Sequence, residues 1–125
     1  MTYENYLADG FIHCQALERL MLDKALALRG TTAAIQVLVA RYNVAQSDYR
    51  VACNRNKTGY ETPETNALKA AVLDVAAQIG THPDVKFNGD HTTSEHAHAT
   101  YTSPREARAK RQTATAFRRW ERSEA

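Results

Sequence analysis

The sequence predicts an all-α protein: a small bundle of about four helices, with one long polar loop at 81–103 before an amphipathic C-terminal helix. Three segments repeat apolar residues at alternating spacings of three and four, as a helix with one buried face requires. The apolar residues are mostly Ala, Leu and Val, which suit helix packing. With 125 residues, 43% hydrophobic and 24% charged, the chain has the size and composition of one folded domain.

Residues 1–80 are predicted to form a three-helix core. The first helical segment begins after Thr2 or after Asp9, which are both suitable N-caps, and ends at Gly30. Apolar residues lie on two of its sides, so we expect it to lie centrally or to contribute to an oligomer interface. One side carries Leu7, Phe11, Cys14, Met21, Ala25 and Leu28, and the other carries Ile12, Ala16 and Leu20.

The next two helices have clear start signals. Thr31 or Thr32 caps a helix that continues to about Lys57, and Thr62 followed by Pro63 starts another that ends at Gly80. The short linker between them favours an antiparallel hairpin.

Residues 81–103 lack helical periodicity and are predicted to form an extended polar arm that reaches outward. Within this segment, residues 85–87 followed by Asn88-Gly89 could form a short β-hairpin, because that dipeptide readily adopts a type I′ turn.

The C-terminal segment 104–125 is predicted to be a basic amphipathic helix that begins with a capping box, Ser103-Pro104-Arg105-Glu106. It contains seven basic and three acidic residues, whereas the rest of the chain contains nine basic and eleven acidic residues. The positive charge is therefore concentrated at this end.

Six arginines lie on one side of this helix, within an arc of about 140° when successive residues are placed about 100° apart. They are Arg105, Arg108, Arg111, Arg118, Arg119 and Arg122. Guanidinium groups match phosphate oxygens and carboxylates, so this side is a candidate for binding nucleic acid or an acidic protein. The alternative is an ordinary solvated face on a helix that packs through Phe117 and Trp120, the predicted docking face on the opposite side.

A second nucleic-acid hypothesis rests on residues 40–50, which superficially resemble the helix-turn-helix of bacterial regulators, with Asn43 as the turn residue. The glycine usual at the turn is absent, and an uninterrupted helix fits the same apolar spacing. The spacing favours the uninterrupted helix.

Metal or cofactor binding has little support in the sequence. His91, His96 and His98 are weak zinc or nickel candidates, because no fourth ligand lies at a diagnostic spacing, and a solvated, titratable loop is the favoured explanation. Cys14 and Cys53 match no metal motif and are expected to be buried, reduced thiols. We therefore expect no metal and no cofactor.

The sequence contains no catalytic motif, and Cys14 and His13 point in different directions on a helix, so we expect no enzyme. The leading hypothesis is a non-enzymatic helical assembly or adaptor protein, such as a small phage or viral particle component. It would self-associate or bind a protein partner through the 81–103 loop and the arginine-rich helix. The alternatives are a DNA- or RNA-binding regulator and a small inhibitor of a host enzyme.

The expected location is inside the cell or within a viral particle. No stretch of the sequence is apolar enough to cross a bilayer, and the first thirty residues lack the basic start and apolar core of a signal peptide. We therefore expect neither membrane association nor secretion by a signal peptide.

Overall fold

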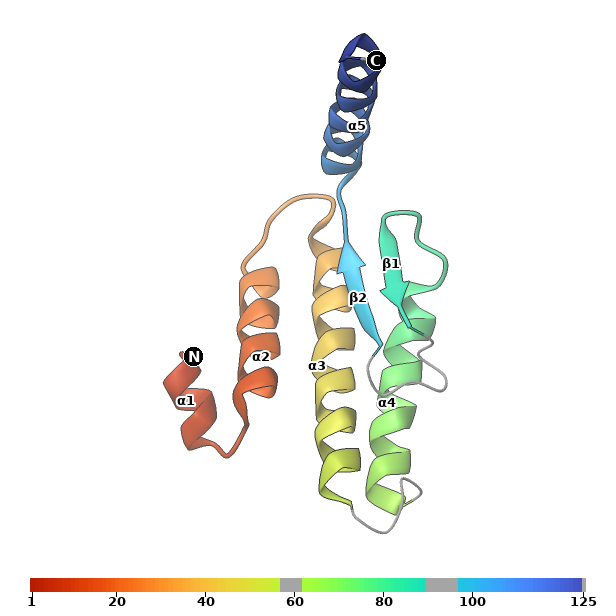
Figure 1. Ribbon diagram of the computed structural model, residues 1–125. Coiled ribbons are helices and arrows are strands. Elements are labelled where there is room, and N and C mark those ends of the chain that lie inside the picture. Colours follow the sequence, from red (N-terminus) through yellow and green to blue (C-terminus); the bar gives the residue numbers. More distant parts are fainter. Residues whose placement is uncertain (57–61, 90–96, 125) are drawn as a thin grey trace.

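The computed structural model describes residues 1–56, 62–89 and 97–124 of the chain. Within these residues it contains five helices and one small antiparallel sheet, so the predicted mostly helical fold is confirmed (Figure 1). The elements in chain order are α1 (Tyr3–Ala8), α2 (His13–Leu26), α3 (Ala33–Arg55), α4 (Pro63–Ile79), β1 (Val85–Asn88), β2 (His98–Tyr101) and α5 (Pro104–Glu124).

Helix α3 is the centre of the fold. It packs against α2 on one side and α4 on the other, and β2 lies along it (Figure 1). Tyr42 of α3 and Val72 of α4 are fully buried, and the ring of Tyr42 meets the ring of Phe87 from β1 edge to face, with centroids 5.0 Å apart. The buried residues form one core where α3, α4 and the sheet meet. Burial of each large apolar side chain there contributes about 1.5 to 3 kcal/mol to stability.

The boundaries of α3 and α4 agree with the prediction to within a few residues, and α4 has the predicted caps. Thr32 precedes α3 as predicted, but its side chain makes no capping hydrogen bond. Thr62 and Thr65 cap the start of α4 reciprocally: the Thr65 amide donates to Thr62 Oγ1 at 3.2 Å, and the Thr62 amide donates to Thr65 Oγ1 at 3.0 Å. Gly80 ends α4 with a φ of +63°, a conformation that favours glycine.

The N-terminal region contains two helices where the sequence predicts one. Gly10, with a φ of +100°, ends α1 and reverses the chain before α2 begins. The predicted start at Thr2 is confirmed, since Thr2 Oγ1 accepts the amide of Asn5 and caps α1. The alternative start after Asp9 is wrong, because Asp9 is at the end of α1 and Ile12 precedes α2. Tyr6 then ties α1 to α2 by donating its hydroxyl proton to Asp23 Oδ2 at 2.6 Å.

Helix α2 lies at the edge of the fold and not at its centre. Ala16 and Ala25 face α3 and are buried, whereas Leu17 and Met21 are 44% and 55% exposed. The contact with α3 is also polar: Arg19 donates two hydrogen bonds to Asp48, at 2.9 and 2.8 Å, and Gln15 donates a third at 3.0 Å. Because α2 meets α3 through small and charged side chains, apolar residues on its other sides, such as Leu17 and Met21, remain uncovered.

The ends of the segment 81–103 form the sheet. β1 and β2 pair antiparallel with Val85 opposite Tyr101 and Asn88 opposite His98. The predicted strand at 85–87 is therefore confirmed. The prediction of a two-residue turn at Asn88-Gly89 is wrong, because the strand that pairs with β1 begins only at His98. The prediction that the whole segment reaches outward is also wrong at this strand, since Ala97 and Ala99 are buried against the body.

The helix-turn-helix hypothesis at Asn43 is wrong. Helix α3 continues through this position, and among the described residues only glycines have positive φ. Asn43 is buried, and its side chain bonds to the backbone of Ala99 in β2 instead of forming a turn.

Candidate functional site in the C-terminal helix

Helix α5 is separate from the rest of the protein, which we call the body (α1–α4 and the sheet). It continues beyond the end of β2 and projects away from the body (Figure 1). Among the described residues it forms no extended packing interface with any other element, and every side chain described in it is exposed. Its two predicted faces are therefore both available to a partner.

The exit of α5 from the body is restrained on both sides of a short linker. The amide of Thr102 donates to the carbonyl oxygen of Asp84 at 2.9 Å, which holds the linker to the loop before β1. Ser103 caps α5 by accepting the amide of Glu106 at 3.1 Å. Pro104 follows directly, and a residue before proline is restricted to extended conformations. The helix therefore leaves in the direction of β2.

The arginine face of α5 comprises the six predicted arginines. All of them are exposed, and within the described parts of the chain none forms an ion pair with a carboxylate. They extend over about 25 Å of helix, given a rise of about 1.5 Å per residue. The face can therefore donate charge-assisted hydrogen bonds to phosphates or carboxylates of another molecule.

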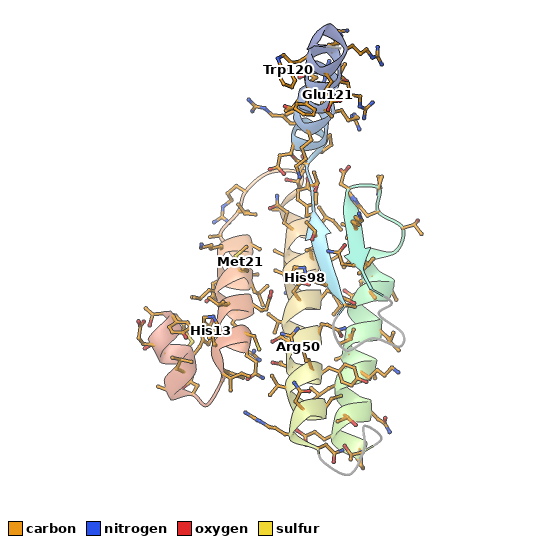
Figure 2. The ribbon with its side chains drawn as sticks, in the orientation of Figure 1. His13, Met21, Arg50, His98, Trp120 and Glu121 are labelled. Carbon is orange, nitrogen blue, oxygen red and sulfur yellow. The ribbon has the colours of Figure 1, made fainter. Side chains whose placement is uncertain are left out.

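The aromatic face of α5 is Ala109, Thr113, Ala116, Phe117 and Trp120. The two rings lie against each other with centroids 5.8 Å apart, but Phe117 remains 56% exposed and Trp120 58% exposed. The expectation that this pair anchors α5 to its own body is therefore wrong, because the restrained linker directs the helix away. Figure 2 shows Trp120 on the projecting helix, far from the labelled residues of the body.

A second exposed apolar surface lies on the body, and the sequence did not reveal it. It is a groove of about 430 Å³ between α2, α3 and β2, which we call the α2–α3–β2 groove. Met21 and Leu28, which are 55% and 39% exposed, lie along its α2 side, while Val39 and Ala40 of α3 contribute to its floor. The sequence contained one related signal, since apolar residues on two sides of the first helical segment suggested an oligomer interface, and Met21 and Leu28 belong to the first of those sides.

The polar edge of this groove explains one of the predicted metal candidates. His98 Nε2 lies 3.6 Å from Glu18 Oε1, so β2 and α2 meet through this pair (Figure 2 labels His98). His91 and His96 lie outside the described residues. Within the described residues no three His, Cys, Asp or Glu side chains lie close enough together to hold a metal ion.

Both cysteines are free thiols, as predicted, but only Cys53 is buried. Burial works against the thiolate of Cys14, but hydrogen bonds from Arg50 and Ser47, together with the Arg50 charge, outweigh it and hold the pKa of this thiol below its ordinary value of 9.0. The neighbouring His13 accepts or donates a hydrogen bond with Tyr3 Oη at 2.8 Å. Cys14 and His13 thus have different partners, which is not the arrangement of a nucleophile with its base.

No protein family, curated protein or solved structure matches this chain. Among the described residues, no helix combines the length and apolar character needed to span a membrane. The two faces of α5 and the groove are therefore the surfaces of this chain that indicate a function.

Proposed function

We propose that this chain is a non-enzymatic assembly or adaptor protein that contacts its partner through α5. The observation that carries the proposal is the exposure of Phe117 and Trp120 on a helix that has no extended interface with its own body. Aromatic side chains are enriched where proteins bind one another, since each buries a large apolar area at a small entropic cost. An exposed aromatic pair on a projecting helix fits that role.

The residues that stabilise the fold are also separate from those that we propose to contact a partner. The core formed by α3, α4 and the sheet includes no residue of α5. A partner can therefore bind α5 without disturbing the folded body. By analogy with other small helical proteins, we propose that the protein is a component of a larger assembly, such as a phage or viral particle. Recovery of the chain in purified particles would test this proposal.

The test compares three tagged full-length proteins in crosslinking and affinity capture from the native source. They are the natural protein, the double variant Phe117→Ser with Trp120→Ser, and a control, Leu26→Ser. Leu26 is 52% exposed but lies outside both α5 and the groove. The proposal expects the natural protein and the control to capture the same defined partner, which can be a second copy of this chain. The double variant should fail to capture that partner. Equal recovery by all three proteins, or no partner at all, would contradict it.

A second candidate function is nucleic-acid binding, which the arginine face favours. Six exposed guanidinium groups without carboxylate partners in the described residues could follow a phosphate backbone. On a duplex, the logarithm of the binding constant should fall with the logarithm of salt concentration by about 0.9 for each phosphate neutralised.

The salt dependence provides the test. If the arginine face binds a duplex, Arg111→Gln combined with Arg118→Gln should reduce this slope by about 2. The control is Arg41→Gln, because Arg41 is exposed on α3 and lies outside the arginine face. An absence of binding at low salt would eliminate this candidate.

A further inference from the structure

We infer that α5 of one copy of this chain places its aromatic face in the α2–α3–β2 groove of a second copy, and that the two copies exchange helices reciprocally. The inference rests on the proposed function and identifies the partner as the chain itself. It joins two apolar surfaces that the single chain leaves exposed: Phe117 and Trp120 on α5, and Met21 and Leu28 on the groove.

The linker excludes the simpler arrangement in which α5 fills the groove of its own chain. The groove is lined by Thr100 and Tyr101, so it lies directly beside the point where the chain leaves β2. To fill it, α5 would have to reverse direction within Thr102 and Ser103. Thr102 is bonded to Asp84, and Ser103 is restricted to extended conformations by Pro104. A short, restrained connection of this kind favours exchange between two copies.

The charges at the edges of the two surfaces are complementary. Glu18 and Lys24 line the groove on the α2 side, so both signs are present along this edge. Lys110 and Glu121 flank the aromatic face of α5 on one side, again with both signs. Lys110 and Glu121 lie about 16 Å apart along α5, and Glu18 and Lys24 about 9 Å apart along α2, so one opposite-charge pair can form in a given register. That pair is either Lys110 with Glu18 or Glu121 with Lys24. With the aromatic face in the groove, the arginine face points outward and stays available to an anionic partner.

The area of the contact favours a reciprocal exchange over a single contact. A buried aromatic side chain covers about 150 to 250 Å², and roughly half of that area is still exposed on each ring here. The two rings and the groove surface under them would therefore bury about 300 to 500 Å² in one contact, which is below what a stable interface needs. Two such contacts give about 600 to 1,000 Å² before Met21, Leu28 and the alanines are counted, which approaches the lower end of stable dimers at about 1,200 Å².

The first measurement is the mass of the full chain by sedimentation velocity across a range of concentrations. The inference expects a dimer that dissociates on dilution. Trp120 is the only tryptophan of the chain, so its fluorescence reports directly on α5. Its emission should shift to longer wavelength as the dimer dissociates.

Variants on both surfaces then test the contact itself. Met21→Lys and Trp120→Glu should each weaken the dimer at least tenfold, and the two substitutions together should restore much of the lost affinity, because the new charges would face each other. Leu26→Lys is the matched control, since Leu26 is an exposed apolar residue of α2 that does not line the groove. Circular dichroism confirms that each variant is folded.

Three results would overturn the inference: a monomer at all concentrations, a dimer that Met21→Lys leaves unchanged, or two single variants whose effects simply add. A dimer sensitive to Trp120→Glu alone would indicate contact between two α5 helices instead. If the chain is monomeric but the natural protein still captures a different partner through Phe117 and Trp120, the inference fails while the proposed function stands.

Discussion

Asn43 binds both backbone groups of Ala99: its side-chain amide donates to the Ala99 carbonyl oxygen at 2.9 Å, and its side-chain oxygen accepts the Ala99 amide at 2.9 Å. Thr102 bonds to Asp84 across the two strands, and hydrogen-bonded pairs alternate with non-hydrogen-bonded ones, so Ala99 opposite Phe87 has its polar groups pointing away from β1. A side chain from the central helix therefore takes the place of a third strand. This pair of bonds satisfies the free edge of β2 at this point and fixes the strand from which α5 departs.

We expect Asn43→Ala to lower the free energy of unfolding by about 2 to 4 kcal/mol, because it leaves an amide and a carbonyl group buried without partners. Urea denaturation followed by circular dichroism measures the change. Arg41→Ala, at an exposed position of the same helix, should change stability by about 0.5 kcal/mol or less. Equal stability of both variants would mean that water replaces the side chain of Asn43 without cost.

Asp48 is expected to hold α2 against α3. Asp48→Ala removes the acceptor of Arg19 and of the buried Gln15 together, and should cost about 1.5 to 3 kcal/mol of unfolding free energy. The comparison is Asp74→Ala, whose carboxylate is exposed on α4 and accepts only from Gln78 in the described structure. That substitution should cost about 0.5 kcal/mol or less, and a similar loss in both variants would contradict a special role for Asp48.

The pKa of Cys14, held below 9.0 mainly by Arg50, predicts a pH-dependent reactivity. Iodoacetamide should label Cys14 with a half-maximal rate below pH 9.0, because the thiolate is the reactive form. Arg50→Met should raise the pKa and slow labelling near neutral pH, and the difference should disappear well above pH 9.0, where the thiolate dominates in both proteins. Mass spectrometry of the labelled peptide gives the rate.

Two references make this labelling experiment specific. Cys53 is 1% exposed and should remain unlabelled in the folded protein. Arg55→Met, at the exposed end of α3, should leave the rate at Cys14 unchanged. A pH profile that does not respond to Arg50→Met would remove that guanidinium as the cause.

The length of the linker Thr102-Ser103 should determine whether α5 binds the groove of a second copy or the groove of its own chain. A Gly-Ser-Gly-Ser insertion between Thr102 and Ser103 frees the reversal that the natural linker prevents, so we expect the dimer to become a monomer whose α5 fills its own groove. Sedimentation should then report one chain, while Trp120 fluorescence remains at the shorter wavelength of the buried ring. A dimer of unchanged affinity would show that the linker does not control the exchange.

The helices with strong local signals were predictable, and the packing was not. Thr62-Pro63 and Ser103-Pro104 fixed two helix starts, because capping depends on residues adjacent in sequence. The break at Gly10 was missed because the apolar spacing continues across it. The pairing of β1 with β2 joins residues 10 to 16 positions apart. The bond from Asn43 to Ala99 joins residues 56 positions apart, which no local pattern reports.

The same distinction applies to the candidate site. Helical periodicity predicts that the six arginines share one face of α5, and the structure places them along one continuous, exposed helix. Whether Phe117 and Trp120 meet the body depends on the exit direction, which a single hydrogen bond from Thr102 and the position of Pro104 determine. The α2–α3–β2 groove is formed by three separate elements, so only the fold reveals it.

The separation of α5 from the core has an evolutionary consequence. Substitutions on an exposed helix that supports no other element change stability little. Selection against destabilising mutations therefore removes them less often than substitutions in the core. Recognition can then diverge rapidly at one end of the molecule while Tyr42, Val72 and their neighbours keep the scaffold constant.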